Sequence, residues 1–135
     1  MELTTLAIVL AVILSVFSGI SKAVCDTAAS GFYRSKLFLT YGLLPKFWDK
    51  TMSWKNKWKN GDKKQGEAFF GSSTVFVIFT DGWHHTDFLR DAFFVLSFYA
   101  LMFSGLPLQD LVIALFILFA VKQIIFQFVY FYLNR

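Results

Sequence analysis

Residues 111–133 read LVIALFILFAVKQIIFQFVYFYL, an apolar run with a single charged residue, Lys122. At a rise of about 1.5 Å per residue, a helix of this length crosses the hydrocarbon core of a bilayer, which is about 30 Å thick. Tyr130, Tyr132 and Arg135 at its end are residue types that favour the membrane–water interface. The run therefore predicts a membrane-spanning helix.

The composition of the whole chain also favours lipid over water as its surroundings. Of 135 residues, 56% are hydrophobic and 18 are Phe, and the mean hydropathy is +0.55, too apolar for a soluble domain of this size. Cys25 is the one cysteine, which excludes an intramolecular disulfide and a zinc site of the finger or ribbon type. The length predicts one domain over residues 1–135.

Two further apolar segments complete the predicted bundle. Residues 3–24 are nearly free of charge and no basic residue precedes them, so we expect a membrane helix rather than a cleaved signal peptide. Residues 88–106 reach spanning length, and the turn sequence SGLP at 104–107 predicts an antiparallel hairpin with 110–133. The expected fold is an all-α integral membrane protein with three transmembrane helices. A fourth span over residues 68–88 is the alternative.

The region between the first two spans, residues 25–67, is basic. From Lys22 to Lys64 the chain holds ten Lys and Arg against three Asp, interleaved with tryptophans. This pattern favours anionic lipid headgroups as partners and disfavours nucleic acid. Because basic loops stay on the cytoplasmic side, it predicts a multi-pass protein of the cell membrane with its N-terminus outside and the basic loop inside.

Three segments outside the spans are expected to lie in the membrane interface. Residues 28–44 are predicted to form an interfacial helix. Trp54 and Trp58 are four residues apart, which on a helix makes one aromatic face. Residues 68–87 are predicted to be re-entrant or interfacial, with Ser72 or Ser73 as the N-cap of a helix that continues through both histidines.

Both histidines lie in TDGWHHTD, residues 80–87. On a helix, Asp81, His84 and Asp91 share one face, and this spacing is a half-site for a divalent metal such as Zn²⁺ or Mn²⁺. In that hypothesis His85 or Asp26 transfers protons in a lipid-headgroup hydrolase or transferase. The structural alternative is a polar collar where a helix leaves the headgroups.

Two lysines carry further expectations. Lys22 and Asp26 are four residues apart and are predicted to form an ion pair. Lys122 lies deep within the last span, beside a polar face that Gln123 and Gln127 extend. A lysine at that depth predicts either an ion or proton path or a structural pair with a carboxylate such as Asp81 or Asp91.

Three functions follow from these patterns. The first is a small polytopic membrane subunit that associates with itself or with a larger complex through Ser15, Ser18, Gly19 and Gly105. The second is the metal-dependent interface enzyme, with Asp81 and His84 holding the metal. The third is an ion or proton path past Lys122.

Overall fold

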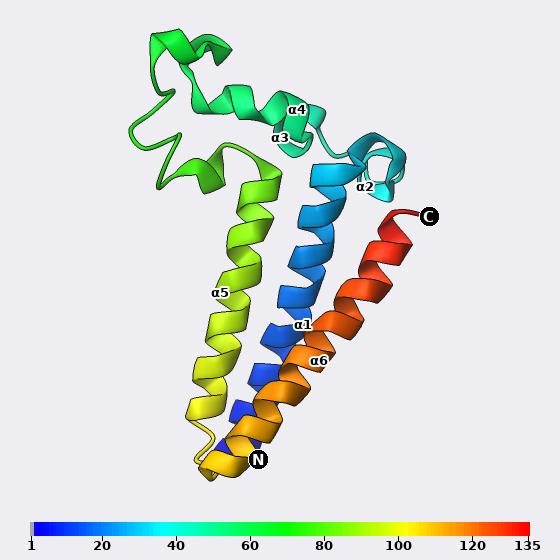
Figure 1. Cartoon of the computed structure of the whole chain (residues 1–135), viewed down its shortest axis with the longest axis vertical. Helices are drawn as coiled ribbons and strands as arrows, with labels where there is room; N and C mark the ends of the chain where they lie inside the picture. Colours follow the sequence, from blue (N-terminus) through cyan, green and yellow to red (C-terminus); the bar gives the residue numbers. More distant parts are fainter. Residues whose placement is uncertain (1) are drawn as a thin grey trace.

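Among residues 2–135, which the computed structural model describes, three long helices form the body of the molecule (Figure 1). They are α1 (Leu3–Ser30), α5 (Gly82–Met102) and α6 (Leu108–Leu133). Short helical turns between α1 and α5 form a cap over one end of this bundle: η1 (Phe32–Arg34), α2 (Lys36–Leu39), α3 (Pro45–Trp48), α4 (Lys50–Ser53), η2 (Trp54–Lys57), η3 (Lys59–Gly61), η4 (Lys63–Gln65) and η5 (Val77–Phe79).

Helix α1 is the central element, with α5 on one side and α6 on the other. Its buried positions carry small side chains, so both neighbours approach its backbone closely. The Ser15 hydroxyl donates to the backbone oxygen of Leu118 in α6 at 2.7 Å, and the Ser18 hydroxyl donates to that of Arg90 in α5 at 2.8 Å. A Cβ atom added to Gly19 would lie 2.6 Å from the backbone oxygen of Lys122.

This packing confirms that small residues of the first helix allow close helix contact. The helices that they bring together belong to the same chain. Ser15 and Ser18 are fully buried, and Gly19 is also buried, all within one chain. For these three residues the prediction of a contact between molecules is therefore wrong, because α5 and α6 already cover them. Gly105, the fourth residue of that prediction, is exposed, and its role stays a prediction.

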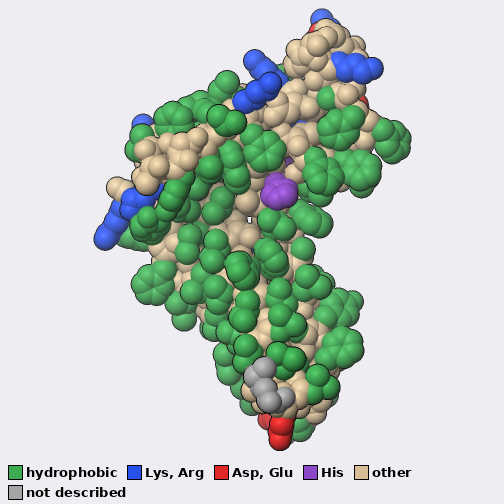
Figure 2. Space-filling model, turned by 180° about the vertical axis from the view of Figure 1, so that it is seen from behind, with side chains coloured by type: hydrophobic (Ala, Val, Ile, Leu, Met, Phe, Trp, Pro, Cys, Tyr) green, Lys and Arg blue, Asp and Glu red, His purple; other side chains and the backbone are tan. Residues whose placement is uncertain are grey.

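Two helices of the described part of the chain, α1 and α6, are long and apolar enough to cross a membrane. Helix α6 exposes most of its surface: its buried residues are Leu118 and Leu133. Hydrophobic side chains cover the shaft of the molecule on the face seen in Figure 2, and Lys and Arg gather toward the capped end.

Several predicted element boundaries differ from the structure. The first helix continues beyond residue 24 to Ser30, so it includes the start of the segment expected to be an interfacial helix. Trp54 and Trp58 do not share a helical face, because η2 ends before Trp58, which is extended at φ −120° and ψ 146°. The helix expected to begin at Ser72 or Ser73 begins at Gly82, after a series of turns.

The cap is joined to the bundle by an apolar cluster and by side-chain amides. Ala28, Phe32, Leu37 and Leu133 form a buried cluster on which Trp48 and Trp83 also pack. Asn56 donates through its Nδ2 to the backbone oxygens of Lys46 and Thr80, both at 2.8 Å. The basic region therefore has a defined position over the start of α5.

Glu67 orders the turn that follows the basic region. Its carboxylate accepts hydrogen bonds from the Ser73 hydroxyl and from the backbone N–H groups of Ser73 and Gly71. These donors favour the ionised form and lower the pKa of Glu67 below its ordinary value of 4.5. The stability that the ionised Glu67 carboxylate gives to this turn is therefore fully present above pH 4.5. It is lost as the pH falls through the lowered pKa of Glu67.

We accordingly expect acidification to loosen this turn selectively. Hydrogen-exchange protection of the Gly71 and Ser73 amides, measured by NMR and corrected for intrinsic rates, should fall below pH 4.5. The Lys59 amide, which donates to the backbone oxygen of Gly66 at 3.0 Å, is the internal control. Equal loss at all three amides, or an unchanged pH profile in Glu67→Gln, would contradict this assignment.

Candidate functional site

Asp81 is the N-cap residue of α5 and is fully buried. Its backbone is extended, at φ −154° and ψ 153°, and its Oδ1 accepts the backbone N–H of His84 at 2.9 Å. A carboxylate at this position satisfies a free N–H of the first turn and interacts favourably with the helix dipole. Asp81 thus determines where α5 begins.

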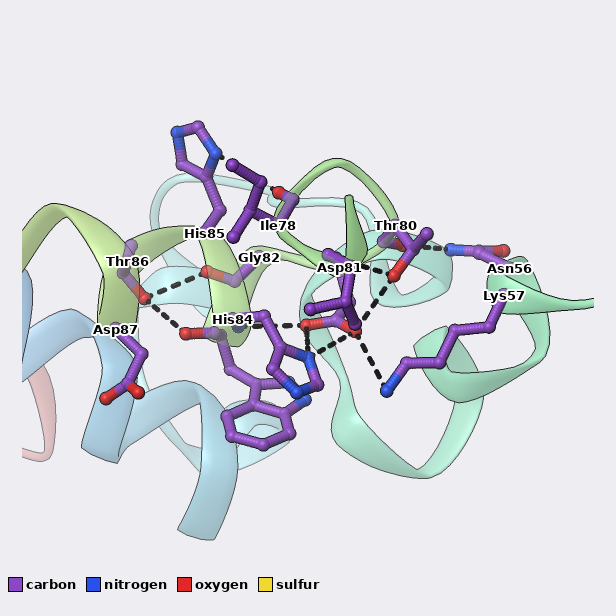
Figure 3. A network of polar contacts seen from close by, with 12 residues as sticks. Asn56, Lys57, Ile78, Thr80, Asp81, Gly82, His84, His85, Thr86 and Asp87 are labelled. Atoms are coloured by element: carbon purple, nitrogen blue, oxygen red, sulfur yellow. Dashed lines mark hydrogen bonds and ion pairs between the residues drawn. The ribbon is translucent and has the colours of Figure 1, made fainter. Parts of the chain in front are cut away.

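The same carboxylate has three cationic or proton-bearing neighbours (Figure 3). The Nδ1 of His84 lies 2.7 Å from both oxygens of Asp81, and the ammonium of Lys57 lies 3.8 Å from Oδ2. The Thr80 hydroxyl is 3.3 Å from the same Oδ2. A buried carboxylate is stable only with such partners, so Lys57 and His84 compensate for its burial.

Aromatic rings enclose this cluster. Gly82 packs against the indole of Trp48 so closely that an added Cβ would lie 2.3 Å from a ring carbon. The Trp83 and His84 rings are neighbours, with centroids 3.7 Å apart. The side chain of His84 is 23% exposed, whereas the side chain of Asp81 is fully buried. His84 is therefore the more accessible member of a carboxylate–imidazole pair.

The other predicted metal and proton-transfer residues lie in separate interactions. Asp91 pairs with Arg90 at 2.8 Å, and the Nδ1 of His85 lies 3.3 Å from the backbone oxygen of Ile78. Asp26 pairs with Lys22 at 2.6 Å, which confirms that predicted ion pair. Within residues 2–135, no three His, Cys, Asp or Glu side chains are grouped closely enough to hold a metal ion. Asp81, His84 and Asp91 are thus not brought together as one ligand set.

Lys122 lies over aromatic rings rather than beside Asp81. Its ammonium is 4.3 Å from the ring centroid of Phe94 in α5 and 6.0 Å from that of Phe119. Cation–π contact of this kind stabilises a partly desolvated ammonium. The carboxylate of Asp81, one of the two partners expected for Lys122, is bound by Lys57 and His84 instead.

Sequence reasoning missed Lys57, Asn56 and the capping role of Asp81. Lys57 lies in a basic region in which every lysine is expected to be a solvated surface charge. The sequence around it therefore does not distinguish it from its neighbours. Asp81 does carry a signal, because Asp before a helix is a preferred N-cap. Ser72 and Ser73, the predicted N-caps, lie about ten residues before the start of α5.

A second feature is the side of α6 that points away from α1, which we call the outer face of α6. Its residues are spaced alternately three and four apart and all are exposed: Ile113, Phe116, Ala120, Gln123 and Gln127. Leu118, which is buried against α1, lies about 200° around the helix from Ala120. Two primary amides, those of Gln123 and Gln127, therefore lie on an otherwise apolar outer surface.

Comparisons of the chain with family models, with curated proteins and with solved structures found no match. A function for it is therefore inferred from the side chains and contacts described above.

Proposed function

We propose that this chain is a small multi-pass protein of the cell membrane that associates with a second copy of itself through the outer face of α6. In this proposal α1, α5 and α6 are three transmembrane helices. The observation that carries it is the pair of exposed amides at Gln123 and Gln127 on an apolar helix.

The distribution of charge along the chain supports the proposed membrane orientation. The cap between α1 and α5 contains most of the Lys and Arg residues of the chain and is placed at the cytoplasmic side, against anionic headgroups. The chain then crosses three times, with its N-terminus outside. Helix α5 has 21 residues, about the length that spans the hydrocarbon core, and lies beside α1.

The amides of the outer face favour a protein partner over lipid. Acyl chains can solvate Ile113 and Phe116 but offer no hydrogen bonds to Gln123 or Gln127. A primary amide both donates and accepts, so the same face on a second copy is complementary to it under twofold symmetry. Alternating three- and four-residue spacing is the seam of a left-handed helix pair, and Ala120 at its middle allows close approach.

The double variant Gln123→Leu/Gln127→Leu tests this contact. Interhelical side-chain hydrogen bonds in membranes contribute about 0.6 kcal/mol each, so losing two of them, one at each glutamine pair of the symmetric contact, should weaken the dimer about eightfold. Förster transfer between labelled copies in liposomes, at increasing lipid-to-protein ratio, measures the dimer. Gln65→Leu, the same exchange in η4 of the cap and away from α6, is the control and should leave the dimer unchanged. An equal effect of both changes would contradict the proposed contact.

Cysteine cross-linking tests the same face by geometry. In a Cys25→Ser background, Ala120→Cys should form a disulfide-linked dimer on mild oxidation, because equivalent residues on a twofold seam approach within disulfide range. Ile117→Cys is matched in depth and is exposed, but lies about 60° away around the helix. Dimers from both variants in equal yield, or monomers at every concentration, would exclude this interface.

A further inference from the structure

We infer that the junction between α2 and the end of α6 is a binding site for an anionic phospholipid. The phosphate lies between the side chains of Lys36 and Arg135, and an acyl chain lies along Phe128 and Phe131. The inference goes beyond self-association and shares with it the membrane setting and one residue, Gln127, which lies on the outer face of α6 and also lines this groove.

A groove of about 630 Å³ opens at this junction. Aromatic rings form its apolar surface, and two cationic side chains also line it. Among the residues that the structure describes, no carboxylate side chain lines it. Its lining residues are Lys36, Gln127, Phe128, Phe131, Tyr132 and Arg135. An apolar surface combined with two positive charges is complementary to a molecule with an anionic head and a hydrocarbon tail.

Lys36 is held in position rather than free in solvent. Its ammonium lies 3.8 Å from the ring centroid of Tyr132, and the Tyr132 hydroxyl is 3.0 Å from that of Tyr41. The flanking residues Ser35 and Leu37 are both buried, which fixes the backbone on either side. The first cation of the groove is therefore preorganised, which lowers the cost of binding an anion.

The end of α6 is fixed by separate contacts. Leu133 belongs to the buried cluster of the cap, and the Nδ2 of Asn134 donates to the Thr27 hydroxyl at 2.9 Å. The Arg135 guanidinium lies 4.9 Å from the ring centroid of Phe131. Arg135, two residues beyond α6, therefore lies at the same groove as Lys36, although the two residues are far apart in sequence.

The depth and shape of the groove identify a phospholipid among phosphate compounds. Lys36 and Arg135 lie next to the ends of α1 and α6, the level at which lipid phosphates are found. Phe128 and Phe131 are 73% and 59% exposed and continue from that level along α6, where a soluble phosphate ester has nothing to cover them. A zwitterionic headgroup brings its own cation toward the lysine and arginine, so an anionic lipid is preferred.

Native mass spectrometry of the full chain in detergent micelles, with phosphatidylglycerol and phosphatidylcholine of equal acyl length, tests the site. We expect one tightly bound phosphatidylglycerol per chain, in preference to phosphatidylcholine. Lys36→Gln and Arg135→Gln should each weaken it about fivefold, the loss typical of one cation near an anionic surface. Lys64→Gln removes an equal charge from an exposed part of the cap and should leave the affinity unchanged.

A further pair of measurements separates phospholipid from free phosphate. The double variant Phe128→Ala/Phe131→Ala should bind long-chain phosphatidylglycerol more weakly than the wild type does. Millimolar inorganic phosphate should not displace this lipid from the wild type. An equal loss of phosphatidylglycerol affinity in Lys36→Gln and Lys64→Gln would overturn the inference in favour of general charge attraction. Equal affinity for the two lipids would also overturn it. Circular dichroism of each variant confirms that the helices persist, and monomers suffice for the assay, so failed dimerisation would not obscure the result.

Discussion

Replacing Asp81 by alanine should destabilise the fold by about 3 kcal/mol, because the change removes an N-cap and leaves two partners of a buried carboxylate without it. The first turn of α5 loses the acceptor of the His84 N–H, and Lys57 and the His84 ring lose the group that compensates their own burial. Denaturant titration in detergent, followed by circular dichroism, measures the effect.

Asp81→Asn separates the two contributions. Asparagine keeps an oxygen that accepts the His84 N–H, so the cap is retained while the charge is lost. Its destabilisation should be smaller than that of alanine. Asp62→Ala is the matched control, because Asp62 also accepts a backbone N–H, from Lys64 at 2.9 Å, in an exposed turn. We expect a change within about 0.5 kcal/mol there. Equal effects of Asp81→Ala and Asp62→Ala would show that the buried cluster contributes nothing to stability.

Gly19→Ala should separate α1 from α6 and destabilise the bundle by about 2 kcal/mol. The added Cβ would lie 2.6 Å from the Lys122 backbone oxygen and 3.1 Å from the Ile125 Cβ. A backbone atom cannot rotate away, so one helix must shift. The sign of the change in stability is informative. Alanine is a better helix former than glycine by about 1 kcal/mol, so without this close contact the substitution would stabilise α1.

Gly31→Ala is the control for this substitution. Gly31 follows α1, and the only nearby atom for an added Cβ is the flexible Asn134 Oδ1 at 3.3 Å. We expect little change in stability there. The same denaturant titration applies to both variants, and a Gly19→Ala protein more stable than wild type would show that α1 and α6 are not in close contact.

The parts of the fold that sequence predicts are those determined locally. Long apolar runs predict α1 and α6, because helix length and side-chain polarity depend only on neighbouring residues. The Lys22–Asp26 pair follows from helical spacing alone. The buried Ser15 and Ser18 were recognised as packing residues, although the identity of the packed neighbour required the fold.

The candidate site depended on contacts that spacing does not contain. Lys57 reaches Asp81 across irregular turns that no periodic pattern describes, and Asn56 joins the same turns to Thr80. Helical spacing predicts that Asp81 and Asp91 share one face. That prediction is wrong, because Asp81 precedes the helix in extended backbone and Asp91 pairs with Arg90.

The central position of α1 has a consequence for biosynthesis. Helices α5 and α6 pack mainly on α1 and little on each other, so neither has its main partner until α1 is in place. Chains are translated from the N-terminus, and α1 therefore leaves the ribosome before the hairpin that covers it. The order of translation thus matches the order in which the packing surfaces are needed, with the first helix serving as the template for the later two.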